Sequence, residues 1–160
     1  MWLLSRNSMS LLVSGNKSKI IDNYNFQHLR WKIAKNETNI DGLILTQENI
    51  DLAIREYRRY LLLKLENPGT PLGPTALMDL VWHYHILDTK KYIEFCQEVF
   101  DSYLHHSPFF GPHSPTGEQD RMNDSRELMI SLYSEKFGDR PINCTNSVAS
   151  CDGKDCDCCG

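Results

Sequence analysis

Apolar side chains recur every three or four residues along most of the chain, which is the spacing of one face of an α-helix. The clearest case covers about residues 47–65, where Thr46 can serve as the N-cap and acidic residues follow in the first turn. Its apolar stripe consists of Ile50, Ile54, Tyr57, Leu61 and Leu65. Asn67-Pro-Gly69 then ends the helix, because proline cannot continue it and glycine permits the turn.

Four other segments show the same spacing. One begins at or near Pro74 and is apolar on almost every side, which predicts a buried helix. The next is capped by Asp88 or Thr89 and ends at Pro108, and the last extends from a capping box at Thr116-x-x-Gln119 to Gly138. A weaker pattern covers about residues 23–35. No segment alternates with period two, so we predict an all-α fold, a compact bundle of about five helices.

The length of 160 residues suits one domain. We assign residues 1–20 to a frayed N-terminal segment, because Arg6, Asn7 and Ser8 interrupt its apolar run and make a secretory signal unexpected. Met1 and Met9 both remain possible starts. Residues 21–140 form the helical domain. No stretch reaches the roughly 18 apolar residues of a membrane span, so we expect a cytoplasmic protein without a membrane partner.

Cysteine is concentrated at the C-terminal end. Of six cysteines, only Cys96 lies in the body, and the others are Cys144, Cys151, Cys156, Cys158 and Cys159. Residues 141–160 have little to bury, so we predict a disordered, flexible tail. Its thiols suit Zn(II) or Cu(I) held in a metallothionein-like manner. Disulfide bonds, or a thiol-rich tail without a single ligand, are the alternatives.

Five of the six histidines fall between positions 83 and 113. Buried histidines that hydrogen-bond to the backbone are the ordinary interpretation, and a metal site is the sharper one. On a helix, His83 and His85 point roughly 200° apart, whereas Asp79 and His83, four residues apart, share a face.

An antiparallel return around Asp88 would bring Tyr92 and Cys96 level with His83 and Asp79. The same alignment places His105 and His106 about 15–20 Å further along, at 1.5 Å per residue. They and His113 would join the site only if the helices cross steeply or the loop folds back. The expected compact set is therefore Asp79, His83 and Cys96, although a lone cysteine on an apolar stripe is more often a packing residue.

These residues carry a resemblance to a known family. The segment Asp79-Leu-Val-Trp-His-Tyr-His-Ile-Leu-Asp-Thr-Lys-Lys-Tyr-Ile-Glu-Phe-Cys96, followed by Leu104-His-His-Ser-Pro-Phe-Phe-Gly111, resembles the glycine-rich domain-containing protein-like family in its short bacterial form. The resemblance covers about residues 45–140 and implies no established activity. The matching positions are Asp79, Trp82, His83, His85, Tyr92, Cys96 and His105 or His106. The long glycine-rich segment of the plant members is missing.

The leading hypothesis is a small helical protein that binds a transition metal, zinc or iron, in its body. The candidate ligands are Asp79, His83, Cys96, His85, His105 and His106, with Trp82 and Tyr92 beside them, while the tail binds or delivers metal. The alternatives are a metal-dependent enzyme that uses the same cluster with an open coordination position, and an interaction module with structural histidines and a protein or peptide partner. The net charge of −4 gives no reason to expect nucleic acid as a partner.

Overall fold

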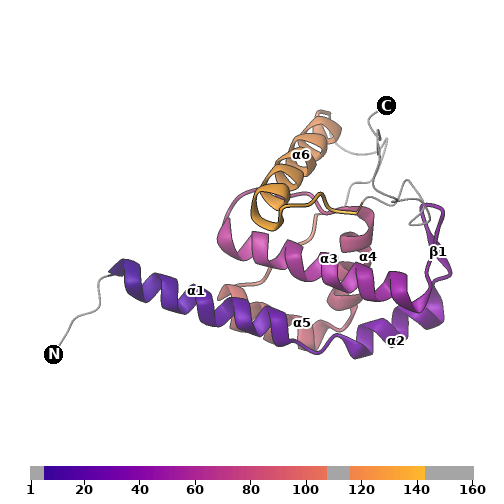
Figure 1. Ribbon diagram of the computed structural model, residues 1–160, viewed down its shortest axis with the longest axis horizontal. Coiled ribbons are helices and arrows are strands. Elements are labelled where there is room, and N and C mark those ends of the chain that lie inside the picture. Colours follow the sequence, from indigo (N-terminus) through magenta and orange to yellow (C-terminus); the bar gives the residue numbers. More distant parts are fainter. Residues whose placement is uncertain (1–5, 108–115, 143–160) are drawn as a thin grey trace.

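Six helices and one small two-stranded sheet make up the computed structural model over residues 6–107 and 116–142, the part of the chain that it describes (Figure 1). Side chains are described from Gly15 onward. The predicted all-α fold is confirmed, with one helix more than the five expected. The elements in chain order are α1 (Arg6–Asn23), α2 (Gln27–Asn36), β1 (Asn39–Ile40), β2 (Leu43–Ile44), α3 (Gln47–Glu66), α4 (Ala76–Leu87), α5 (Thr89–Phe100) and α6 (Glu118–Phe137).

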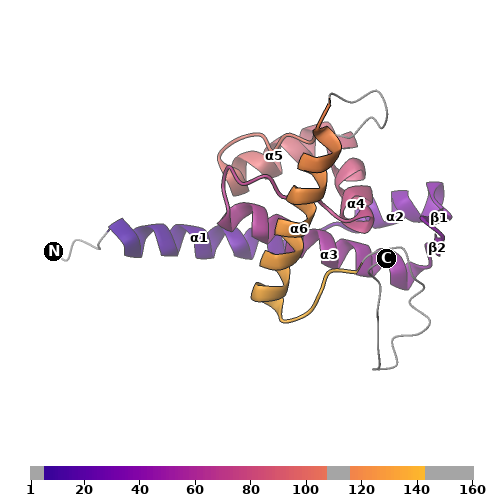
Figure 2. The same ribbon diagram turned by 90° about the horizontal axis from the view of Figure 1, so that it is seen from above.

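Helix α3 is the centre of the domain, because α1, α2, α4 and α6 all pack on it (Figure 1), and Figure 2 shows α6 lying across α3. Its N-cap is Thr46, as predicted, and the Thr46 side chain accepts a hydrogen bond of 3.2 Å from the backbone N–H of Asn49. The predicted apolar stripe is largely buried, with Ile50, Tyr57 and Leu61 fully enclosed. One continuous core therefore lies around α3.

Helices α4 and α5 form a helical hairpin that packs against α3 and α1. Thr75 caps α4, so Pro74 lies just before the helix and not at its first position. The helix buries most of its apolar side chains and also His85. Asp88 connects the two helices, at the position where the sequence predicted a new start.

Helix α5 is shorter than expected, since it ends at Phe100 and not at Pro108. Asp101 follows with φ = 57°, a left-handed conformation that stops the helix and turns the chain. We refer to residues 101–107, which contain no helix or strand, as the strap. It returns along the hairpin toward α4.

Two further boundaries differ from the sequence prediction. The sheet joins β1 and β2 in antiparallel register around Asp41 and Gly42, both with positive φ, and strands of two residues are too short to show alternation. Helix α6 begins after Gly117, also with positive φ, and has no side-chain cap hydrogen bond, so the capping box predicted at Thr116 does not form.

The N-terminal segment is helical and not frayed over most of its length, because α1 begins at Arg6. The C-terminal end of α1 is fixed in the core by Ile21, which is fully buried. The Arg58 guanidinium donates hydrogen bonds to the carbonyls of Ile21, Asp22 and Tyr24. Arg58 thus satisfies carbonyls at the end of α1 and just after it, a contact that apolar periodicity could not reveal.

The core also extends two residues further toward the C-terminus than the predicted domain, which ends at residue 140. Pro141 is buried and the Ile142 N–H donates a 3.3 Å hydrogen bond to the Glu56 carboxylate, so both belong to the domain and not to the predicted tail. Residues 143–160 lie outside the described part of the chain. None of the described helices is long and apolar enough to cross a membrane.

Candidate metal centre

Asp79 and His83 lie one turn apart on α4 and point to the same side of the helix. Their closest atoms, Asp79 Oδ2 and His83 Nε2, are 3.5 Å apart. This is the geometry expected for residues four apart. The helix therefore presents one carboxylate and one imidazole together without any contribution from elsewhere in the fold.

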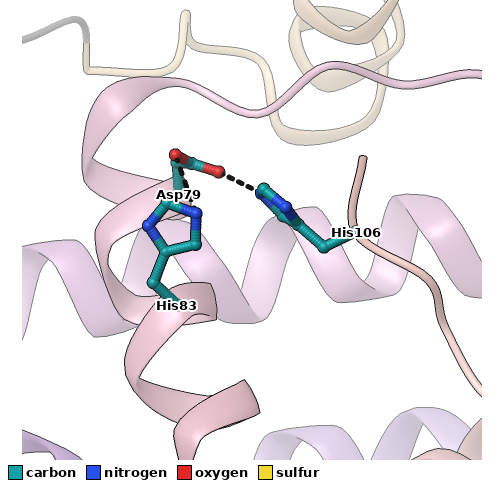
Figure 3. A group of neighbouring side chains, drawn as sticks. All are labelled: Asp79, His83 and His106. Atoms are coloured by element: carbon teal, nitrogen blue, oxygen red, sulfur yellow. Dashed lines mark hydrogen bonds and ion pairs between the residues drawn. The ribbon is translucent and has the colours of Figure 1, made fainter. Parts of the chain in front are cut away.

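The strap supplies a third ligand group, His106. Its Nε2 lies 2.7 Å from Asp79 Oδ1, and its ring centroid is 4.6 Å from that of His83 (Figure 3). One ligand atom from each of the three residues lies within 4.8 Å of the others. Ligands around Zn(II) at 2.0–2.2 Å lie roughly 3–3.5 Å apart, so small side-chain movements bring this group to coordination distance. The Asp79/His83/His106 group can hold a metal ion.

The group lies at the rim of the domain and not in its core. The side chains of His83, Asp79 and His106 are 50%, 33% and 11% exposed. On the inner side, the edge of the Trp82 indole lies against His106, with ring centroids 4.5 Å apart. Trp82 therefore covers the group on the side that faces the core, and the opposite side is open to solvent.

The strap is held in place by the two aromatic residues predicted beside the ligands. The Tyr92 hydroxyl accepts a 2.8 Å hydrogen bond from Trp82 Nε1–H and donates one of 2.5 Å to the Leu104 carbonyl. Leu104 lies two residues before His106. Trp82 and Tyr92 thus fix the position from which His106 reaches Asp79.

Cys96 is not part of this group, although the expected compact set included it. The thiol is buried, and burial raises its pKa, while the neighbouring Leu104 backbone and Tyr92 side chain act more weakly in the opposite direction. Cys96 therefore packs beneath the strap, near Leu104. His106 takes the place in the compact set that the helical alignment gave to Cys96.

His85 lies on the other side of α4, fully buried, as the angular separation from His83 requires. Its Nδ1 is 3.0 Å from the Tyr57 hydroxyl, and its Nε2 has no hydrogen-bond partner among the described residues. Aromatic rings surround it, and burial lowers its pKa to about 3, so the ring is neutral at physiological pH. The rings belong to Tyr24, Phe26, Tyr57, Tyr92 and Phe95.

The remaining candidates are not part of the group either. His105 is exposed and stacks edge-on against Tyr103 at 4.8 Å. His113 and the five cysteines of the predicted tail fall outside the described residues. The predictions made for the tail, zinc, Cu(I) or disulfides, therefore stay predictions.

The apolar pattern predicts that α5 continues through Leu104, which places His106 too far from Asp79, whereas the helix ends at Phe100. The signal that would have corrected it is Asp101-Ser102, two polar residues after the apolar Phe100. Aspartate is one of the few residues other than glycine that adopt the left-handed conformation readily. A helix stop at this point shortens the distance to Asp79 and makes the loop fold back.

Two imidazoles and a carboxylate form a donor set that suits borderline divalent ions. Zn(II) is bound by such sets, and two histidines with one carboxylate also form the usual site of non-haem Fe(II). Hard ions such as Mg(II) and Ca(II) prefer oxygen ligands. The donor set of the group is therefore one that first-row transition metals can use.

Fold and site together define a small helical protein with an Asp/His group able to hold a metal ion. Residues 16–128 match the model of the UCP032817-like family, so the chain belongs to that family. The family name carries no activity. No match was found among the curated proteins or among the solved structures. None of these comparisons tests the resemblance to the glycine-rich domain-containing protein-like family, which stays a prediction.

Proposed function

We propose that the protein binds one divalent transition-metal ion, Zn(II) or Fe(II), through Asp79, His83 and His106. The observation that carries the proposal is the convergence of an i, i+4 pair on α4 with a histidine 27 positions away from Asp79, all within 4.8 Å. A buried structural histidine would be expected to satisfy its ring nitrogens within the core. His83 is instead half-exposed beside a carboxylate and a second imidazole.

The contact between His106 and Asp79 supports the same conclusion. A hydrogen bond between Nε2 and an ionised carboxylate requires a proton on that nitrogen. A metal ion would take the place of this proton, because Nε2 and the carboxylate oxygen are both good ligands once Nε2 carries no proton. The observed arrangement of Asp79 and His106 is therefore close to the one that coordination needs.

Metal titration of variants tests the proposal. Wild-type protein should bind one more equivalent of Co(II) or Zn(II) than His83→Ala, or bind it about 100-fold more tightly, since even loss of a supporting residue weakens metal sites by 10–100-fold. His105→Ala is the matched control, because it removes a neighbouring exposed imidazole and leaves the three ligands in place. Calorimetry and elemental analysis after anaerobic purification provide the measurements.

A truncation after Ile142 separates the body from the cysteine-rich segment. This end point keeps Pro141 and Ile142, which belong to the core. The difference between wild type and His83→Ala should persist in the truncated chain. Equal metal content in wild type and His83→Ala would contradict the proposal and favour an interaction module with structural histidines.

A metal-dependent enzyme is the second candidate, and the exposure of His83 and Asp79 favours it. Three protein ligands leave coordination positions open, as in catalytic zinc sites. Such a site must exchange an external ligand. Addition of azide to the Co(II)-loaded protein would change its absorption spectrum if that position is open.

A further inference from the structure

The strap is held to the domain at few points along its length. Of residues 101–107, Leu104 and His106 are partly buried and the others are exposed. At its start, Lys17 forms an ion pair with the exposed Asp101 carboxylate, a type of surface contact that contributes little. The Tyr103 ring also packs edge-on against Tyr92, with ring centroids 5.3 Å apart. Beyond Tyr103, the position of the strap depends mainly on Leu104 and His106.

These two attachments differ in strength. Leu104 is held from within, because its carbonyl accepts the hydrogen bond from Tyr92, a fully buried residue. His106 is held at the rim by one hydrogen bond to Asp79 and by ring contacts with Trp82 and His83. Segments with few buried contacts open locally at low free energy. Because the outer end is held from the partly exposed surface of α4 and not from the core, we expect it to open before the end that is held by Tyr92.

Two of the three ligands do not share this weakness. Asp79 and His83 project from α4, which packs against α2, α3 and α5. A metal ion would meet this pair already positioned on a rigid helix. His106 is the one ligand that lies on the strap. Coordination of His106 would therefore restrict opening of the strap.

We propose that the site is a metal-operated clasp, in which a divalent transition-metal ion on Asp79 and His83 captures His106 and fastens the strap to α4. This inference rests on the proposed function. The metal controls how firmly the chain leaving α5 is attached, which makes the protein responsive to metal concentration. Because the two effects are thermodynamically linked, any contact that stabilises the closed strap also raises the affinity of the site for the metal.

Hydrogen exchange of the full-length protein tests the clasp. Backbone amides of residues 105–107 should exchange at least about tenfold more slowly with Zn(II) than with EDTA, because local opening is suppressed. Amides of the β1–β2 turn at Asp41 and Gly42, a segment that supplies no ligand and exchanges by local opening, should not change. Zinc binding is measured by calorimetry on the same samples, so that occupancy and protection are known separately.

His83→Ala is the decisive variant. It removes a half-exposed ligand on α4 and one ring contact of His106, and it leaves the His106–Asp79 hydrogen bond in place, so exchange of the strap with and without zinc is compared within this variant. The zinc-dependent protection should disappear. His105→Ala, which alters the strap itself but keeps all three ligands, should retain it.

Each alternative outcome has a defined meaning. Zinc binding that depends on His83 but leaves exchange at 105–107 unchanged would overturn the clasp and leave the proposed function standing. Equal protection in His83→Ala would also overturn the clasp, because the effect would then come from another site. Absence of zinc binding that depends on His83 would overturn both.

Discussion

Two histidines separated by one residue, His83 and His85, occupy opposite environments on α4. His83 is half-exposed beside a carboxylate, and His85 is enclosed by aromatic rings. The sequence predicts this separation, because residues two apart on a helix cannot share a face. What it does not predict is which of the two is buried, since that depends on how α4 is turned against α3 and α5.

The burial of His85 makes a prediction about acid stability. Its folded pKa is about 3, below the ordinary value of 6.5, so the unfolded chain binds this proton at a higher pH than the folded protein. Stability should be complete above about pH 6.5 and fall by roughly 1 kcal/mol per pH unit as the pH decreases toward 3. His85→Gln, measured by urea unfolding at several pH values, should show a shallower decline. His105→Gln, at an exposed position, is the control, and an unchanged slope in His85→Gln would disprove this account.

At the scale of elements, the sequence predicts helices well where their apolar face and their cap are both local. Helix α3 has both, in its stripe of buried residues and in Thr46. The end of α5 and the start of α6 were misplaced because Asp101 and Gly117 take left-handed conformations that leave no periodic signal. Because the predicted helix continued past Asp101, His106 was placed too far from Asp79 to belong to the compact set. Helix α1 was missed because its apolar residues do not form a continuous stripe, and the contact of Arg58 with the carbonyls of Ile21 and Asp22 at its end joins parts of the chain that are far apart in the sequence.

Helix α6 is joined to α3 by a buried polar network that the apolar pattern does not show. The Tyr133 hydroxyl donates to both oxygens of the fully buried Glu56 carboxylate, at 3.0 and 2.8 Å. Arg59 donates to the same hydroxyl at 2.6 Å and to Asp139 at 3.0 Å. Burial raises the pKa of Tyr133, which keeps the phenol protonated and able to donate.

Removing that hydroxyl should loosen α6. In Tyr133→Phe, the Glu56 carboxylate loses its strongest donor, and a buried charge without it costs about 1.5–3 kcal/mol of unfolding free energy. Tyr103→Phe, at a residue that is 42% exposed, should change stability by less than about 0.5 kcal/mol. Urea denaturation of both variants beside the wild type gives the comparison. Equal effects of the two substitutions would mean that the network does not hold α6.

For the whole molecule, the candidate site joins parts of the chain that are adjacent only in the folded state. Asp79 and His106 are 27 positions apart, and their approach requires the α4–α5 hairpin and the reversal at Asp101. The unfolded chain has no such preassembled site. A metal ion that binds the folded state preferentially must therefore stabilise it by mass action.

Thermal unfolding should consequently depend on the metal. With free Zn(II) at 100 times its dissociation constant, the free energy of unfolding should rise by about 2.7 kcal/mol, which corresponds to an increase in Tm of roughly 5–10 °C for a chain of this size. EDTA should reverse the increase. Mg(II) at the same ionic strength should not reproduce it, although the net charge of −4 attracts both ions, because nitrogen ligands select against Mg(II). His83→Ala should lose most of the increase and His105→Ala should keep it. A rise in Tm that is the same in His83→Ala would place the stabilising ion elsewhere on the protein.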